Sequence, residues 1–369
     1  MSAITPIIMP KWGLSMKEGT VTAWLVEEGT AISVGLPILE VETDKIANAV
    51  EAPDPGLLRR KVAAAGDLLP VKALLGVMAD KEVSDAEIDA YVAAYVAPAL
   101  ASDDADAAPA YQFIPVDGIT IRYARKGQTD GTPVLFIHGF GGDLDNWLFN
   151  IDAVGEKAPV IALDLPGHGQ SGIALPGTSI QALAGFVQRF LDAIGVGRAH
   201  LVGHSMGAAI AAQLALDDAN RVASLTLIGA AGLGDEINSA YTDAFATAPS
   251  RRELKPVLEL LFADASMVSR QLVDDVLKYK RLDGVSALLT QLGTALFGGA
   301  VQAAQPGRKL GSAVPVLVVW GREDRIVPVA HAAHAPAAAK VEVFDGAGHM
   351  VQMERANDVN RLIVRHIGG

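Results

Sequence analysis

The clearest sign of chemistry in this sequence is a serine that lies between two glycines. Residues 199–208 read AHLVGHSMGA, so an apolar run leads into G-H-S-M-G at residues 203–207 and an alanine-rich segment follows. This G-x-S-x-G spacing predicts a sharp turn from a strand into a helix, because the glycines leave room for the crossing chain. Such a turn strains the serine backbone, exposes its hydroxyl and lets the Met206 N–H donate to an oxyanion. The motif therefore predicts that Ser205 is a nucleophile for acyl transfer, although a Gly-Ser turn without a catalytic role would show the same bare motif.

An acid and a base that could serve this serine follow later in the chain. The segment VVWGREDRIVP places Asp324 just after an apolar run, with Glu323 as the rival acid, and VFDGAGHMVQME places His349 after the last such run. The chain order Ser205, Asp324, His349 differs from the orders of the two serine protease types and suits a fold in which each residue follows a strand. We therefore expect His349 to deprotonate Ser205 and Asp324 to fix the imidazole tautomer.

The oxyanion of such a reaction needs two N–H donors. The first is predicted at Met206, at the start of the helix that follows the serine. The segment FIHGFGGDLDNW follows an early apolar run, and the Phe140 N–H within it is the expected second donor. We expect His138 and His168 to be structural, since neither follows a late strand as His349 does.

Residues 111–369 alternate between apolar runs and alanine-rich helical patterns. Runs such as PVLFIHG, PVIALDLPG, ASLTLIGA and VPVLVVWG predict a parallel sheet with crossover helices. About 80 residues of helical pattern separate LTLIGA from VPVLVVWG, and we expect them to form a cap over the carboxyl edge of the sheet, at about residues 233–310. With the serine, acid and base motifs, this region resembles the α/β-hydrolase family. The resemblance implies an α/β-hydrolase fold with the triad Ser205, Asp324 and His349.

The first 81 residues carry a different pattern. Short alternating runs such as TVTAWLV, PILEVE, ANAVEA and GLLRRKVA are separated by glycine or proline, which predicts an all-β domain. EEGTAISVGLPILEVE and AAGDLLPVKALLGVMA share the spacing of a glycine and a valine, so two similar halves should form a flattened barrel. Residues 82–110 are rich in acidic residues, alanine and proline and contain neither lysine nor arginine, and we interpret them as a linker. Within this linker, Ser84 and Glu87 form a capping-box pattern for a short helix.

A lysine stands at the predicted tip of a hairpin in this first domain. The segment ILEVETDKIANAVEAP, residues 38–53, reads as two short strands hinged on T-D-K. For a hairpin alone, a solvated charge is the simple interpretation of Lys45. However, the EVETDK segment, an earlier E-G turn and the EAPDPG segment make residues 1–81 resemble a lipoyl domain. That resemblance implies lipoate on Lys45, although Ile46 stands where the family usually has a small residue.

The two domains in this order are similar to one known family, the acetyltransferase components of acetoin dehydrogenase complexes. Its members join a lipoyl domain to an α/β-hydrolase-like domain, which fits the full length of this chain. The resemblance implies that an acetyl group passes from lipoate on Lys45 to coenzyme A. It also implies two partners, a thiamine-diphosphate-dependent acetoin dehydrogenase E1 component and a flavin-dependent dihydrolipoamide dehydrogenase. The H-x-x-x-D-G signature of the common dihydrolipoamide acyltransferases does not occur in the sequence.

Two alternatives remain open at this point. The same triad can send the acyl group to water, which would make the second domain an esterase or thioesterase with an attached lipoyl carrier domain. The chain could instead be a carrier or scaffold with a vestigial second domain, but an intact triad argues against this. Arg251, Arg252 and Lys255 in the predicted cap would suit the phosphates of coenzyme A or, more simply, a solvated helix face.

The composition limits the classes of partner. Acidic residues number 42 against 30 basic ones, and the formal net charge of −12 argues against nucleic acid or an anionic membrane surface. The absence of cysteine excludes a thiol nucleophile, a disulfide and an iron–sulfur site, and it suits a reducing compartment. The first residues lack the basic start and apolar core of a signal peptide, and no run reaches about 18 apolar residues. We therefore expect a cytoplasmic protein that uses neither a membrane nor a metal.

Overall fold

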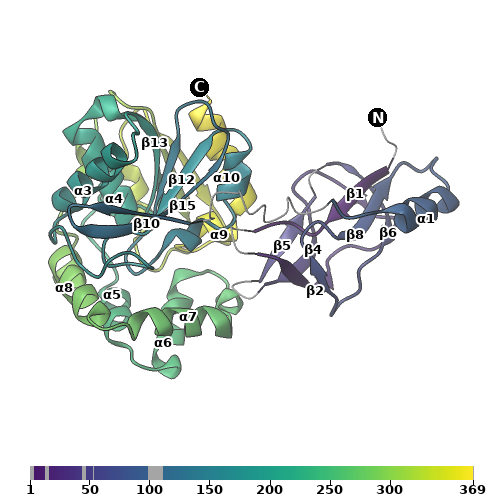
Figure 1. Ribbon diagram of the computed structural model, residues 1–369, viewed down its shortest axis with the longest axis horizontal. Coiled ribbons are helices and arrows are strands. Elements are labelled where there is room, and N and C mark those ends of the chain that lie inside the picture. The colour runs from purple at the N-terminus through teal and green to yellow at the C-terminus, as the bar shows by residue number, and fades with distance from the viewer. Residues whose placement is uncertain (1–3, 13–15, 44–46, 53, 99–110, 369) are drawn as a thin grey trace. The chain divides into compact units, whose positions relative to one another are not determined.

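The computed structural model divides the chain into two compact units, Met1–Pro109 and Ala110–Gly369. Each unit has its own sheets, and Figure 1 shows how the strands and helices follow one another within each. The residues that the structure describes are 4–12, 16–43, 47–52, 54–98 and 111–368.

The first unit is built from two four-stranded antiparallel sheets. Their strand orders are β1-β8-β6-β3 and β5-β4-β2-β7. The strands are β1 (Ile4–Ile8), β2 (Glu18–Trp24), β3 (Ala31–Ile32), β4 (Pro37–Glu42), β5 (Ala47–Glu51), β6 (Gly56–Lys61), β7 (Leu68–Pro70) and β8 (Leu74–Ala79). One apolar core takes side chains from both sheets, among them the fully buried Val21, Leu39 and Leu58. These sheets confirm the all-β architecture predicted from the short alternating runs.

A hairpin of β4 and β5 carries the segment that contains Lys45. The two strands pair antiparallel up to Glu42 opposite Ala47, so residues 43–46 connect them. From Leu39 to Glu42 of β4, Leu39 and Val41 face the core while Glu40 and Glu42 face solvent. This alternation fixes the register, because a slip of one residue would turn the glutamates into the core. Lys45 itself lies outside the described residues.

A short helix extends the first unit beyond the predicted boundary at residue 81. Helix α1 (Asp85–Ala94) begins at the capping box expected from the sequence, where the Ser84 hydroxyl accepts a hydrogen bond from the Glu87 N–H. The side chain of Ile88 is fully buried and packs in a small apolar cluster with side chains of β8. The helix is therefore part of the folded unit.

Polar contacts also hold this helix on the sheet. Arg59 of β6 pairs with Asp85 at 2.9 Å, and the Tyr95 hydroxyl donates to the Lys72 carbonyl oxygen at 2.9 Å. The structure thus differs from the predicted linker of residues 82–110. Its first part packs on the first unit, because a buried isoleucine and these polar contacts fasten it to the sheet.

The second unit contains one eight-stranded sheet with the order β16-β15-β14-β13-β11-β12-β10-β9. Its strands are β9 (Gln112–Val116), β10 (Ile119–Gly127), β11 (Val134–Ile137), β12 (Pro159–Leu163), β13 (Ala199–His204), β14 (Val222–Ile228), β15 (Val316–Gly321) and β16 (Lys340–Phe344). β10 pairs antiparallel with both β9 and β12, and all other pairs are parallel. β11 and β15 are buried along their whole length, as expected for central parallel strands with helices on both faces. This mixed sheet confirms the predicted α/β architecture.

Helices between the parallel strands and after the last strand cover the sheet (Figure 1). They are α2 (Ile151–Gly155), α3 (Ile180–Ala193), α4 (Met206–Asp217), α9 (Val351–Glu354) and α10 (Ala356–Ile367). α4 packs against β13 and β14, α3 packs beside α4, and α10 also packs against β14. The helix that follows the serine motif is therefore held by the centre of the sheet.

The helices between β14 and β15 form the cap. They are α5 (Ser239–Thr247), α6 (Arg251–Leu258), α7 (Arg270–Lys280) and α8 (Val285–Phe297), and Figure 1 shows them grouped on one side of this unit. The Tyr279 hydroxyl of α7 donates to the Gly167 carbonyl oxygen at 2.6 Å, and Phe245 of α5 lies against Gly141. Gly141 follows β11 and Gly167 follows β12, so the cap covers the carboxyl ends of the parallel strands, where such folds bind ligands.

We expect Ile88→Ala to lower the free energy of unfolding of the first unit by about 2–4 kcal/mol, because it leaves a cavity between α1 and β8. The matched control is Val96→Ala, which truncates a side chain that is 85% exposed just beyond the helix. Hydrogen–deuterium exchange of the full chain measures the effect: the β8 amides should exchange faster in Ile88→Ala than in the control. Equal protection in the two variants would show that α1 contributes nothing to the stability of this unit.

Candidate active site

Ser205 lies at a strained turn between β13 and α4. Its backbone has φ 54° and ψ −118°, a combination that residues other than glycine rarely adopt. The turn needs glycine on both sides: a Cβ at Gly203 would lie 2.4 Å from the Gly207 carbonyl oxygen, and one at Gly207 would lie 2.1 Å from the Ile137 carbonyl oxygen. The structure therefore has the sharp turn that the sequence motif predicts.

The loop after β11 passes directly beside this serine. A Cβ on the glycine that precedes Phe140 would lie 3.0 Å from the Ser205 Cβ. The Phe140 side chain is buried beneath the cap, with the rings of Phe245 and Phe297 each 6.0 Å from it, centroid to centroid. Met206 is the first residue of α4, where a helix offers its N–H no internal acceptor. The structure thus brings both predicted oxyanion donors to the serine turn.

Asp324 and His349 form a buried hydrogen-bonded pair. Asp324 follows β15 and His349 follows β16, and the Asp324 Oδ2 lies 2.8 Å from the His349 Nδ1. The two side chains are 0% and 2% exposed. Because an ionised carboxylate can only accept, the His349 Nδ1 carries the proton and Nε2 remains free to act as the base. The rival acid Glu323 instead accepts from the Ala347 N–H, so the acid beside the imidazole is Asp324.

This pair lies next to the serine turn. The Nε2–H of His204, one residue before Ser205, donates to the His349 carbonyl oxygen at 3.0 Å, and the two imidazole rings are 4.6 Å apart. Gly229, after β14, is also close, since a Cβ there would lie 3.2 Å from the His349 Nδ1. Burial holds the pKa of His204 well below its usual value, so this ring is neutral and acts as a fixed donor. Ser205, Asp324 and His349 therefore gather at neighbouring strand ends of one edge of the sheet.

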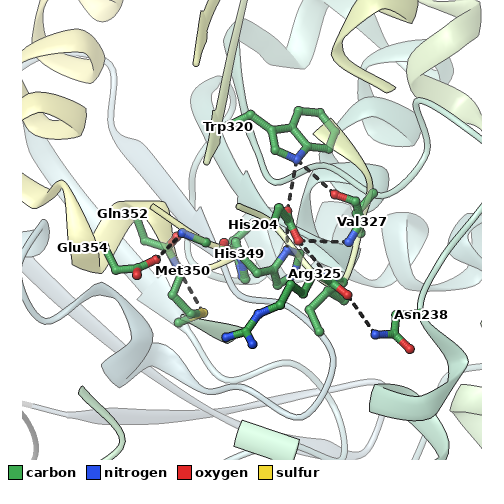
Figure 2. Close-up of polar contacts among 12 residues, drawn as sticks. His204, Asn238, Trp320, Arg325, Val327, His349, Met350, Gln352 and Glu354 are labelled. Atoms are coloured by element: carbon green, nitrogen blue, oxygen red, sulfur yellow. Dashed lines mark hydrogen bonds and ion pairs between the residues drawn. The ribbon is translucent and has the colours of Figure 1, made fainter. Parts of the chain in front are cut away.

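Three more N–H groups point to the Asp324 carboxylate. The backbone N–H groups of Ile326 and Val327 donate to Oδ1 at 2.8 Å and 3.0 Å, and the Trp320 indole N–H donates to Oδ2 at 3.0 Å. Figure 2 shows Trp320 and Val327 converging beside His349. No motif in the sequence predicts a role for Trp320. The only available signal is its position four residues before the acid, at the end of a buried strand.

Glu354 ties the loop that carries His349 to the cap. Its two carboxylate oxygens accept from the Gly348 N–H and from the Ala263 N–H, both at 2.7 Å. Figure 2 shows this carboxylate beside the loop. Burial raises the pKa of Glu354 above its ordinary value, although these amide hydrogen bonds oppose the shift. The base is therefore anchored through the residue that precedes it.

Arg325, next to Asp324, ties the loop that carries this acid to the same part of the cap. Its guanidinium donates to the carbonyl oxygen of Glu259 at 2.6 Å and also to that of Phe262. The loops of the acid and the base thus hold the same cap segment, residues 259–263. Sequence motifs do not reveal this arrangement, because the bonded residues are 63 to 91 positions apart along the chain.

Two further histidines support loops beside the site. The His138 Nε2 accepts from the Leu165 N–H at 2.9 Å, so its Nδ1–H donates to the Gly139 carbonyl oxygen at 2.8 Å. The His168 ring lies 5.1 Å from the His138 ring, and both side chains are buried. Burial lowers the pKa of His138 to about 4 and that of His168 to about 3. Both rings are neutral at pH 7, and their bonds go to loop backbone.

Two of the three cap cations considered in the sequence, Arg251 and Lys255, are paired with acids of the cap itself. Arg251 pairs with Asp274, and the Lys255 Nζ lies 3.5 Å from a Glu259 carboxylate oxygen. These pairs favour the solvated-face interpretation over a phosphate site. Within the described part of the chain, no group of three or more His, Asp or Glu side chains is placed to hold a metal ion. None of the helices in the described ranges of the chain is long and apolar enough to cross a membrane.

We expect the second unit to lose stability as the pH falls from about 6.5 to about 4. The folded pKa of His138, about 4, lies below the ordinary value of 6.5, so the unfolded chain takes up a proton first and is favoured in this range. Protonation would also break the Leu165 N–H bond to Nε2. The full penalty for this one ring is on the order of 3 kcal/mol.

Urea unfolding of the full chain between pH 4 and pH 8 measures this loss. His138→Gln removes the titrating ring and should flatten the acid side of the stability curve. His334→Gln changes an exposed histidine and should leave that slope as in the wild type. An unchanged slope in His138→Gln would assign the acid sensitivity to other groups.

Comparison with known proteins assigns both units. Residues 132–356 match the family model for the alpha/beta hydrolase fold, and residues 5–78 match the model described as biotin-requiring enzyme. A meta-cleavage product hydrolase from Pseudomonas fluorescens IP01 is 25% identical, with a TM-score of 0.63 over 70% of this chain and 97% of its own. A bacterial membrane phospholipase A is 27% identical, with a TM-score of 0.62 over 70% of this chain and 86% of its own.

Two relatives span almost the whole chain. The dihydrolipoyllysine-residue acetyltransferase component of the acetoin cleaving system from Cupriavidus necator is 65% identical over 99% of this chain and 98% of its own length. The component of the same name from Pseudomonas putida is 48% identical over 99% of this chain and 98% of its own length. These matches confirm the predicted fold class and the predicted family. The chain belongs to the family of dihydrolipoyllysine-residue acetyltransferase components of acetoin cleaving systems.

Proposed function

We propose that the second unit transfers an acetyl group from a dihydrolipoyl thioester to coenzyme A through Ser205, His349 and Asp324. The observation that carries this proposal is the buried Asp324–His349 pair beside the strained turn of Ser205. Membership of an acetyltransferase family supplies the reaction class. The pair supplies an oriented base, which a serine needs to act as a nucleophile.

The first half of the reaction loads the serine. His349 Nε2 takes the hydroxyl proton as the Ser205 Oγ attacks the thioester carbonyl, and Asp324 stabilises the imidazolium that forms. The N–H groups of Phe140 and Met206 donate to the oxyanion of the tetrahedral intermediate. His349 then returns the proton to the leaving thiolate, and an acetyl-serine remains.

The second half of the reaction unloads the serine. His349 deprotonates the incoming thiol of coenzyme A, which attacks the acetyl-serine carbonyl while the same two N–H groups bind the oxyanion. Collapse of the intermediate returns the proton to Ser205 and releases acetyl-coenzyme A. The aromatic cover over Phe140, formed by Phe245 and Phe297, keeps water away from this side of the site.

We propose Lys45 as the residue that carries the lipoyl group of this family. The described strands fit this assignment, because β4 and β5 pair up to Glu42 and Ala47 and leave a connection of residues 43–46 that contains the lysine. A lysine in such a short connection suits both a modifying enzyme and a carrier arm. When attached there, the lipoyl group supplies the acetyl thioester that the second unit receives.

The family name places its members in a system with other components. We propose a thiamine-diphosphate-dependent acetoin dehydrogenase E1 component as the source of the acetyl group. Transfer to coenzyme A leaves a dithiol, so an oxidising partner must restore the disulfide before another cycle. We propose that a dihydrolipoamide dehydrogenase does this.

Hydrolysis is the second candidate function. The solved structures similar to the second unit at 25% and 27% identity include a meta-cleavage product hydrolase and a phospholipase. A Ser-His-Asp triad can also pass its acyl group to water. Transfer and hydrolysis share every step up to the acetyl-serine and differ only in the acceptor that attacks it.

We expect Ser205→Ala to lower acetyl-coenzyme A formation from acetyl-dihydrolipoamide by on the order of 10⁶, because the members of such a triad act as a unit. Asp324→Asn should lower it by about 10⁴ by favouring the wrong imidazole tautomer. Glu323→Gln is the matched control, since Glu323 is next to Asp324 but bonds to Ala347. This variant should remain close to the wild type. The assay follows acetyl-coenzyme A and free acetate in parallel.

Two outcomes of that assay decide between acetyl transfer through this triad and the alternatives. Near-wild-type transfer by Ser205→Ala would place the acyltransferase site elsewhere. Release of mainly acetate by the wild type with coenzyme A saturating would make hydrolysis the function.

We expect Lys45→Arg to abolish lipoylation and therefore acetyl uptake from the E1 component, because a guanidinium keeps the charge but cannot form the amide. The second unit of this variant should still use free acetyl-dihydrolipoamide at the wild-type rate. Lys81→Arg is the matched control, since Lys81 also follows an aspartate. The mass spectrum of protein from a lipoylating host should show one lipoyl increment in the wild type and in the control. An increment retained by Lys45→Arg would place lipoate on another lysine.

A further inference from the structure

We infer that Trp320 is a positioning residue for the triad, because its indole N–H holds the same Asp324 oxygen that faces His349. This inference rests on the proposed function, in which Asp324 and His349 activate Ser205. Nothing in the sequence motifs assigns Trp320 a role, and it lies in β15 rather than in the loop that carries the acid.

The contact is direct and buried. The Trp320 side chain is fully buried, and its Nε1–H donates to the Asp324 Oδ2 at 3.0 Å and is shared with the Val327 carbonyl oxygen at 3.2 Å. The Asp324 side chain is 0% exposed, so no water competes for this oxygen. Since β15 fixes the tryptophan, the N–H is present at a set position before any proton moves.

Trp320 completes the set of donors to the carboxylate. An ionised carboxylate offers about four lone-pair sites. Oδ1 accepts from the Ile326 and Val327 N–H groups, and Oδ2 accepts from the Trp320 indole and from the His349 Nδ1. Each oxygen therefore has two donors, and rotation of the carboxylate about its Cβ–Cγ bond would break all four contacts. This arrangement fixes the direction in which Oδ2 meets the imidazole.

The Trp320 indole also reduces the negative charge on the Asp324 Oδ2 that faces the His349 imidazole. A second donor on Oδ2 draws part of the negative charge away from His349, so it weakens the preference of the imidazole for its protonated form. Loss of the indole N–H should therefore have two effects. The carboxylate gains freedom, which slows catalysis, and more of the charge on Oδ2 then faces the imidazole, which moves the acid limb of the pH profile.

The test compares two tryptophan-to-phenylalanine variants of the full chain. Trp320→Phe removes the N–H and keeps an aromatic ring in the core. Trp147→Phe makes the same change at an equally buried tryptophan whose Nε1 has no hydrogen-bond partner among the described residues. Acetyl transfer from acetyl-dihydrolipoamide to coenzyme A is measured from pH 5 to pH 9 for both variants, for the wild type and for Ser205→Ala.

We expect Trp320→Phe to lower kcat about tenfold, the equivalent of one buried hydrogen bond, with KM changed less than about twofold. The acid limb of kcat/KM should move to higher pH. Trp147→Phe should change kcat less than about twofold and leave the limb in place. A pure packing role for Trp320 would lower kcat without moving the limb, and that result would overturn the inference.

Ser205→Ala separates this inference from the proposed function. If Ser205→Ala still transfers acetyl groups, the proposed function fails. If Ser205→Ala is inactive and Trp320→Phe matches the wild type, only the role of Trp320 fails.

A measurement on the wild type covers the case in which Trp320→Phe does not fold. In chain labelled with ¹⁵N-tryptophan, the Trp320 indole proton should shift as the pH passes through the acid limb of kcat/KM, because its acceptor also bonds His349. The Trp147 indole proton should not shift in that range. An unmoved Trp320 signal would overturn the inference.

Discussion

The close crossing of α4 over the end of β11 is the constraint on which the rest of the site depends. Gly207 lies so near the Ile137 carbonyl oxygen that a Cβ would be 2.1 Å from it. This contact sets Ser205 beside the loop that carries Phe140, so the proposed nucleophile and its proposed oxyanion donors come from two closely packed segments. A side chain at position 207 would push those segments apart. The strained backbone of Ser205 persists because contacts on both sides of the turn hold it.

The positions of Asp324 and His349 depend on a second constraint. Fixed N–H groups surround the buried charge of the Asp324 carboxylate. The Asp324 carboxylate is fully excluded from solvent, and four N–H donors surround it. An ionised carboxylate that is buried without such donors strongly destabilises the folded state. Because the donors belong to the backbone, to a strand tryptophan and to His349 itself, they are already oriented before the proton transfer from Ser205 that we propose. The charge that develops on His349 therefore meets an environment that needs no rearrangement.

The sequence predicts the features whose causes are local. The G-x-S-x-G spacing demands the turn at Ser205, and the capping box at Ser84 and Glu87 demands the start of a helix. The remaining features arise from contacts across the chain. A capping box shows where a helix begins but not what covers its apolar side, so the interpretation of residues 82–110 as a linker extends too far. The role of Glu354 likewise cannot be predicted from the sequence, because its partner Ala263 lies 91 positions away.

The choice between coenzyme A and water as acceptor depends on the cap more than on the triad. Ser205 is 6% exposed, so a thioester must enter a largely covered site to reach it. The cap segment of residues 259–263 is held by Arg325 from the loop of the acid and by Glu354 from the loop of the base. Displacement of that segment would therefore loosen the two loops that orient the Asp324–His349 pair. With the segment in place, both loops are held and the rings of Phe245 and Phe297 cover Phe140, so the proposed activation of an acceptor and the exclusion of water belong to the same arrangement.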